Sequence, residues 1–151
     1  MTKEAAALVE GAKQWATYYG EYSNGPEGHA LTAQLRARAA WAENNADAFA
    51  DIFIDNGSAL FGDTQLKGRE EIRGYLVEAF AGPYKATRLF EEPREVRLLT
   101  DSSAIIVTDG GLVREGEETV DPANLVRAMW VAVRHDGDWR IVSYQSCPIR
   151  N

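Results

Sequence analysis

Asp109 is the acidic side chain whose position most favours chemistry. It interrupts an apolar run at residues 105–108, and strand alternation places it on the same face as Ile105 and Val107. If that face is buried, desolvation raises the pKa of the carboxyl group, which then serves as a general base or as a neutral hydrogen-bond donor. In the alternative, a bulge at Asp109-Gly110-Gly111 turns the carboxylate to solvent or pairs it with Arg127. Because a single carboxylate has no partner for the return proton, Asp109 is a candidate base without a catalytic set.

Other residue types do not occur at spacings that support familiar chemistry. His29 precedes a predicted helix and His135 flanks a predicted turn, and neither has a second ligand at metal spacing, so no metal site is expected. No Ser-His-Asp order, glycine-rich phosphate loop or dinucleotide fingerprint occurs, which argues against a nicotinamide or flavin enzyme and predicts no cofactor. Cys147 is the one cysteine; it cannot form a disulfide within the chain and is expected to be a small buried residue.

Composition predicts one ordinary globular domain. The chain has 151 residues, of which 45% are hydrophobic and 26% charged, with a formal net charge of -7. This charge repels phosphate backbones, so nucleic acid is not an expected partner. The first residues carry acids and alanines, unlike a secretory signal, and no apolar run reaches the roughly 18 residues of a membrane span. We therefore expect a cytoplasmic protein that binds neither nucleic acid nor membrane.

Helices are predicted in the first half of the chain. Apolar residues recur at helical spacing over residues 5–19, 30–44 and 47–53, and again after Gly68 until Gly82-Pro83 ends the pattern. Asn45 is a plausible N-cap for the third of these helices. Asp55-Asn56-Gly57 predicts a turn before a short strand at residues 58–61.

Strands are predicted in the second half. Residues 94–100, 104–113, 125–135 and 139–147 are rich in valine, isoleucine and aromatic residues. Asp136-Gly137 is a strong hairpin signal between the last two runs. Helices followed by antiparallel strands indicate an α+β fold.

The hairpin predicts which side chains share a face of the sheet. A two-residue turn pairs His135 with Asp138, places Ala132 opposite Ile141, Trp130 opposite Ser143 and Ala128 opposite Gln145, and directs these pairs to one side. The opposite face is also apolar, and it carries Met129, Val131, Val133, Val142 and Tyr144. We expect that second face to form a homodimer surface. The alternative is that the N-terminal helix covers it.

Three segments resemble a known superfamily. Asp47-Ala48-Phe49-Ala50-Asp51-Ile52-Phe53 precedes the first strand, Lys67-Gly68-Arg69-Glu70-Glu71-Ile72 opens the long helix, and Asp136-Gly137-Asp138-Trp139-Arg140-Ile141-Val142 forms the last hairpin. Together they resemble the SnoaL-like and ketosteroid-isomerase-like proteins of the nuclear transport factor 2 (NTF2) superfamily. Overall, the sequence is most similar to the SgcJ/EcaC-type proteins that accompany enediyne polyketide synthases in antibiotic biosynthesis.

The resemblance implies a cystatin-like, cone-shaped barrel in which a bent, mostly antiparallel sheet wraps N-terminal helices around an apolar cavity. It also implies frequent dimerisation and a polyketide-derived ligand, and it turns the face of Asp109 inward. The two carboxyl positions of the isomerase branch fall on Phe61 and Ala128, so the steroid-isomerase mechanism is not implied. Ser143 and Gln145 stand where hydrating or cyclising relatives have histidines.

Trp130 is the expected centre of the pocket, because its ring suits stacking on a conjugated ligand and its indole N–H can donate a hydrogen bond. The full predicted pocket comprises Trp130, Gln145, Ser143, Ala128, Phe61, Tyr75, Trp41 and Phe53. The alternative is that these aromatic residues only fill the core, which is the favoured interpretation for Phe53.

Three functions follow from these expectations. The first is an accessory protein that binds a hydrophobic polyene or enediyne-precursor intermediate and contacts the polyketide synthase. The second is a cofactor-free cyclase, isomerase or hydratase that uses Asp109, and the third is a dimeric interaction module without a ligand. The predicted organisation is an N-terminal helical extension and loop at residues 1–28, followed by the SnoaL-like domain at residues 29–151.

Overall fold

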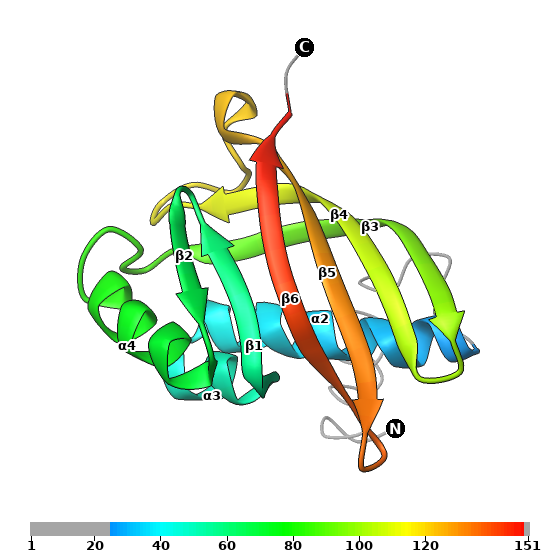
Figure 1. Cartoon of the computed structure of the whole chain (residues 1–151). Helices are drawn as coiled ribbons and strands as arrows, with labels where there is room; N and C mark the ends of the chain where they lie inside the picture. Colours follow the sequence, from blue (N-terminus) through cyan, green and yellow to red (C-terminus); the bar gives the residue numbers. More distant parts are fainter. Residues whose placement is uncertain (1–24, 150–151) are drawn as a thin grey trace, which may run out of the picture.

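The computed structural model describes residues 25–149. The predicted helix at residues 5–19 lies outside the described residues, as does most of the predicted N-terminal extension. The described chain folds as helices followed by strands, so the predicted α+β class is confirmed (Figure 1).

Six strands form one bent, mixed sheet in the order β2-β1-β6-β5-β4-β3. The strands are β1 (Phe53–Phe61), β2 (Thr64–Lys67), β3 (Arg88–Thr100), β4 (Ser103–Val113), β5 (Val126–His135) and β6 (Asp138–Pro148). β1 runs parallel to β6, and every other pair is antiparallel. The sheet does not close into a barrel, because β2 and β3 are its two edges.

In residues 25–149, three α-helices cover the concave face of the sheet. They are α2 (Pro26–Ala42), α3 (Ala46–Asp51) and α4 (Arg69–Phe80), and a short 3₁₀ turn, η2 (Pro122–Asn124), precedes β5. α2 lies across the sheet and contacts β3, β4, β5 and β6, whereas α3 and α4 pack together beside β1 (Figure 1). None of the helices in residues 25–149 has the length and apolar content needed to cross a membrane.

Two local signals near β1 had different outcomes. The N-cap prediction is confirmed, because the Asn45 side chain accepts a hydrogen bond of 3.0 Å from the Ala48 N–H at the start of α3. The predicted turn at residues 55–57 is wrong, because β1 continues through it. A Cβ on Gly57 would lie 3.1 Å from the Phe53 ring and 3.2 Å from the Val142 carbonyl oxygen, so this glycine permits close packing instead of a turn.

Two strand segments escaped prediction. β2 was not expected, and β3 begins at Arg88 instead of Arg94. The first half of β3 carries two glutamates, and its pairing with β4 shifts between Pro93 and Glu95. Charges and proline hide a strand from propensity arguments. The early start matters because it brings Glu91 into the sheet.

The hairpin register is partly wrong. His135 pairs with Asp138 and Ala132 with Ile141, as predicted, but an irregularity follows and Trp130 lies opposite Tyr144. The two residues Val131 and Ala132 face three residues of β6, which leaves Val142 as the extra residue of a bulge. Beyond the bulge, every β6 side chain is on the opposite face from its predicted one. Ala128 consequently pairs with Ser146, and Met129 with Gln145.

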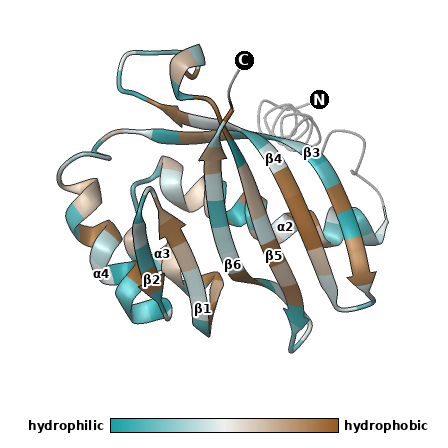
Figure 2. Cartoon of the chain, turned by 45° about the horizontal axis from the view of Figure 1, so that its top comes forward, coloured by the Kyte–Doolittle hydropathy of each residue, from teal (hydrophilic) through white to brown (hydrophobic). Residues whose placement is uncertain are grey.

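The convex face of the sheet is the predicted homodimer surface. Tyr144 does not belong to it, because the bulge places this side chain in the core. Met129 is 39% exposed, and Val131, Val133 and Val142 are half-buried. Figure 2 shows hydrophobic residues along much of β4, where Ala104 and Ile106 are buried while Ile105 and Val107 are half-buried. Self-association through this face stays a prediction.

Candidate functional site

A cavity of about 270 Å³ lies at the end of the sheet where β4 and β6 finish. Its walls come from α2, α3, β1, β3, β4, β5, β6 and the connections between them. The lining residues are Trp41, Phe49, Phe61, Gly62, Tyr84, Leu89, Gly111, Leu112, Arg114, Asn124, Val126, Trp130, Tyr144 and Ser146. Aromatic and aliphatic side chains dominate this set, as in small-molecule pockets.

The deep part of the cavity is a cluster of aromatic rings. Ring centroids of Trp130 and Tyr144 are 4.4 Å apart, and those of Trp41 and Phe49 are 5.5 Å apart in an edge-to-face arrangement. Such pairs prefer tilted or edge-on geometry. Phe61 completes the cluster and lies 5.5 Å from Tyr144. The rings therefore present a continuous hydrophobic wall.

Both indole N–H groups of this wall are already bonded to protein acceptors. Trp41 donates to the Thr87 hydroxyl at 2.9 Å, and Trp130 donates to Glu91 at 3.1 Å. The prediction that the Trp130 N–H serves a ligand is therefore wrong in this structure. What Trp130 offers the cavity is its ring, which suits stacking.

Glu91 is a buried acid beside the cavity that the sequence did not reveal. Its side chain is buried, and Oε1 accepts hydrogen bonds from Gln34 at 2.7 Å and from Trp130 at 3.1 Å. Burial raises the pKa of Glu91 to about 7, against the opposing effects of Gln34, the neighbouring Thr108 hydroxyl, Trp130 and Arg38. Within residues 25–149, neither Oε2 nor the Thr108 hydroxyl makes a hydrogen bond of ordinary geometry, although the two groups are near enough for Thr108 to lower the pKa of Glu91. A proton on Oε2 would let Glu91 donate to Thr108.

Glu91 stands behind the cavity wall and does not line the cavity. Trp130 separates the two, because this residue both lines the cavity and donates to the carboxyl group. One signal in the sequence pointed to such a group: a buried tryptophan needs an acceptor for its N–H. It did not say which residue supplies that acceptor.

The structure separates the eight predicted pocket residues into three groups. Trp130, Phe61 and Trp41 line the cavity. Three others lie in or against the core beside it: Phe53, whose ring is 5.7 Å from Phe49; Tyr75, which stacks on Phe61 at 5.4 Å; and Ala128, which is buried. Ser143 and Gln145 do not line it.

Ser143 and Gln145 point away from the cavity because of the bulge at Val142. Gln145 is exposed on the convex face, and the Ser143 hydroxyl lies 3.4 Å from that of Ser58. The polar group that β6 does bring to the cavity is Ser146.

Asp109 is not a buried base. Ile106, Thr108 and Gly110 face inward, so alternation turns Asp109 to the convex face, opposite to the expectation from the resemblance. There it accepts from Arg127 at 2.7 Å and 3.2 Å and from Arg94 at 3.0 Å. The hydrogen bond from Arg127 holds its pKa below the usual value. The alternative prediction, pairing with Arg127, is confirmed.

The remaining candidates do not form a site. Residues 25–149 contain no group of three histidine, cysteine, aspartate or glutamate side chains that could hold a metal ion. Cys147 is exposed on β6, so the expectation that it is buried is wrong. It follows the strand past the bulge, on the same face as Gln145.

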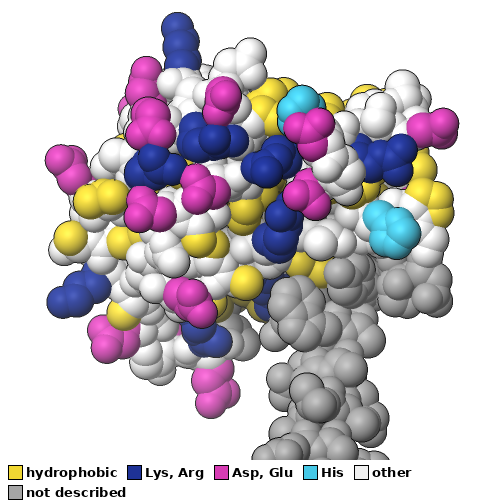
Figure 3. All heavy atoms as spheres, turned by 90° about the horizontal axis from the view of Figure 1, so that it is seen from below, with side chains coloured by type: hydrophobic (Ala, Val, Ile, Leu, Met, Phe, Trp, Pro, Cys, Tyr) yellow, Lys and Arg dark blue, Asp and Glu magenta, His cyan; other side chains and the backbone are white. Residues whose placement is uncertain are grey.

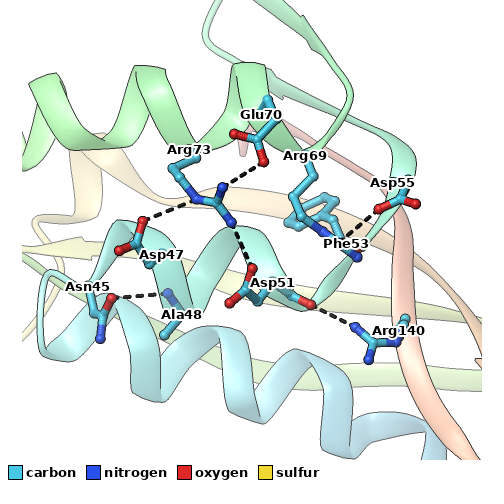
Figure 4. A network of polar contacts seen from close by, with 10 residues as sticks. All are labelled: Asn45, Asp47, Ala48, Asp51, Phe53, Asp55, Arg69, Glu70, Arg73 and Arg140. Atoms are coloured by element: carbon cyan, nitrogen blue, oxygen red, sulfur yellow. Dashed lines mark hydrogen bonds and ion pairs between the residues drawn. The ribbon is translucent and has the colours of Figure 1, made fainter.

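Charged side chains of both signs are interspersed on the side of the molecule that is seen from below the view of Figure 1 (Figure 3). An ion-pair network belongs to the helices and strands nearby (Figure 4). Arg73 of α4 contacts Asp47, Asp51 and Glu70 at distances of 3.1, 2.8 and 2.6 Å, and Arg140 of β6 donates to the Asp51 carbonyl at 2.7 Å. These bonds join α3, α4 and β6, and the acidic partners neutralise the guanidinium of Arg73, so the network is structural.

Solved structures share this fold. A domain of unknown function with a cystatin-like fold from Nostoc punctiforme is 23% identical, with 80% of this chain and 75% of that chain covered and a TM-score of 0.72. An NTF2-like protein with a cystatin-like fold from Novosphingobium aromaticivorans is 16% identical, with 82% of each chain covered and a TM-score of 0.68. A ketosteroid isomerase-like protein from Erwinia carotovora atroseptica is 17% identical, with 85% and 99% covered and a TM-score of 0.66. No curated protein matches the sequence. The family model of the SnoaL-like domain matches residues 29–150.

Proposed function

Because this chain belongs to the SnoaL-like domain family, we propose that its aromatic cavity binds a hydrophobic polyketide intermediate, of the polyene or enediyne-precursor type. In this proposal it is a cytoplasmic accessory protein of antibiotic biosynthesis, of the SgcJ/EcaC type. The observation that carries the binding role is the set of aromatic rings around about 270 Å³. A conjugated, planar carbon skeleton is the ligand whose surface such rings complement.

Binding is favoured over turnover by the chemistry of the lining. Within the part of the chain that the structure describes, the cavity-lining residues include no aspartate, glutamate, histidine or lysine. Asp109 faces outward in ion pairs, which removes the basis for the enzyme that uses it. Glu91 is buried behind Trp130 and cannot contact a ligand while that side chain keeps its position.

Homodimerisation through the convex face belongs to the same proposal. Met129, Val131 and Val133 form an apolar strip on β5 that α2, α3 and α4 leave uncovered. The same strip could contact a synthase. An interaction module without a ligand is the competing function, and it predicts that blocking the cavity changes nothing.

A fluorescence titration tests ligand binding. Diphenylhexatriene, a neutral conjugated polyene, is added while tryptophan emission is followed, and we expect quenching because Trp41 and Trp130 line the cavity. The matched variants are Val126→Phe, which adds bulk inside the cavity, and Val131→Phe, which adds the same bulk on the convex face of the same strand. Val126→Phe should weaken binding and Val131→Phe should not. Absence of quenching in the unmodified protein, or equal effects of the two variants, would exclude this cavity as the site.

A further inference from the structure

We infer that the ligand of this cavity is an amphipathic carboxylate whose charged group is bound by Arg114 at the mouth while its conjugated body enters the aromatic wall. This inference rests on the proposed function and specifies the ligand class. Arg114 does not belong to the cluster of aromatic rings described above.

The polarity of the cavity is confined to one end. Trp41, Phe49 and Trp130 form the deep part and are almost completely buried. Their two indole N–H groups are bonded to Thr87 and Glu91, so the deep part directs no indole donor at a ligand. Among the described residues that line the cavity, Arg114 is the only charged one, and it is exposed directly after the end of β4.

Arg114 is available to an anion. Within residues 25–149 its guanidinium takes part in no ion pair or hydrogen bond, in contrast to Arg69, Arg73 and Arg127, which are all held by acids. The acids that follow it, Glu115, Glu117 and Glu118, are exposed and do not line the cavity. The backbone of Arg114 is engaged, because the Glu117 N–H donates to the Arg114 carbonyl at 3.0 Å.

Two further donors lie at the mouth. Asn124, in the connection before β5, and Ser146, on β6, line the cavity with Arg114. A guanidinium presents two parallel N–H groups that match a planar carboxylate, and an amide and a hydroxyl can donate to its remaining lone pairs. The mouth therefore suits a flat anionic group.

Charge favours a carboxylate over a phosphate. The chain has a net charge of -7, so its overall field does not attract anions. One guanidinium compensates one negative charge, which a carboxylate supplies, whereas a phosphate monoester carries about 1.5 to 2. A conjugated chain that ends in a free carboxylic acid fits both features, because its body would contact the aromatic rings and its carboxylate would pair with the guanidinium at the mouth.

The test compares an acid with its neutral ester. Cinnamylideneacetic acid, a phenyl-substituted dienoic acid, and its methyl ester are titrated against the unmodified protein, Arg114→Gln and Arg97→Gln. Arg97 is the matched control, because it is exposed and paired with Glu95 at 3.6 Å on β3, outside the cavity, and its replacement removes the same charge. We expect the acid to bind the unmodified protein about tenfold more tightly than the ester. This is the ratio of dissociation constants expected from one additional charge-assisted hydrogen bond.

The variants assign that preference. Arg114→Gln should bind acid and ester equally while keeping the affinity for the ester, and Arg97→Gln should keep the preference. If both compounds bind the unmodified protein equally, or if Arg97→Gln also loses the preference, the inference about Arg114 is wrong while the cavity remains a binding site. If neither compound binds and diphenylhexatriene does not bind either, both the proposed function and the inference about Arg114 are wrong.

Discussion

Glu91 gives the sharpest test of the energetics of the cavity wall. Its carboxyl group has a pKa of about 7 in the folded protein against an ordinary value of 4.5, so folding favours the protonated form. The folded state thus holds a proton that the unfolded state releases above pH 4.5. Stability from this group is complete below about pH 4.5 and is lost as the pH rises through about 7.

The size of the loss follows from the shift. The rise of the Glu91 pKa from 4.5 to about 7 corresponds to about 3.5 kcal/mol, at about 1.4 kcal/mol for each tenfold change in the acid dissociation constant. In Glu91→Gln the side chain stays neutral, its carbonyl accepts from Gln34 and Trp130, and its amide can donate to the neighbouring Thr108 hydroxyl, which makes no hydrogen bond of ordinary geometry within residues 25–149. The difference in the free energy of unfolding between the variant and the unmodified protein should therefore increase by about 2–3 kcal/mol, in favour of the variant, as the pH rises from about 5 to about 9.

Chemical denaturation at a series of pH values measures this difference directly. Thermal melts should show it as a relative gain of roughly 4–12 °C for a domain of this size. Glu92→Gln is the control, because Glu92 is the next residue, is exposed, and faces the other side of the sheet. The reasoning is refuted if the Glu91→Gln difference is constant across this range, or if Glu92→Gln reproduces it.

Four further substitutions test the fold around the site. Asp109→Asn should leave ligand binding unchanged and lower the free energy of unfolding by about 0.5–1 kcal/mol at neutral pH, because the ion pair with Arg127 is partly exposed. Because the pKa of Asp109 is lowered in the folded protein, this cost should disappear as the pH falls through that pKa. A loss of ligand binding in this variant would show that Asp109 belongs to the site. Gly110→Ala should destabilise the domain by more than about 3 kcal/mol in urea denaturation, because its Cβ would lie 1.9 Å from a backbone oxygen of β3. Gly74→Ala, which has open space around its Cβ, should instead stabilise α4 by about 0.5–1 kcal/mol. Equal effects of the two variants would contradict the close approach of β3 to Gly110. Asn45→Ala should cost about 1 kcal/mol through the lost cap of α3, and a neutral result would show that the cap is not needed.

Local patterns predicted the elements well. Helical spacing anticipated α2, α3 and α4, Asn45 marked the start of α3, and Asp136-Gly137 marked the last turn. Each of these signals lies within a few residues of the structure that it specifies. The fold class and three cavity residues, Trp41, Phe61 and Trp130, followed from such signals and from the family resemblance.

What failed was the assignment of side chains to faces of the sheet. Asp109 was placed by alternation within its own strand, yet the inward face of β4 is set by the neighbours that pack on it, and Thr108 and Gly110 occupy that face. Glu91 was missed because the first half of its strand contains two glutamates and a proline, which are rare in strands, and because the strand is held in place by β4 and by Gln34 of α2. Both facts depend on contacts distant in sequence.

The bulge at Val142 explains why the cavity is apolar inside and polar at its mouth. The irregular pairing of β1 with β6 occurs beside it, where Gly57 lets the Val142 carbonyl approach closely. Because one extra residue exchanges the faces of β6, Tyr144 enters the aromatic wall and Ser143 and Gln145 leave it. The hydroxyl of Ser146 then reaches the cavity only near the strand end, beside Arg114 and Asn124. The bulge therefore contributes to this polarity by keeping Ser143 and Gln145 out of the cavity, while Arg114 and Asn124 at the mouth belong to the connection between β4 and β5.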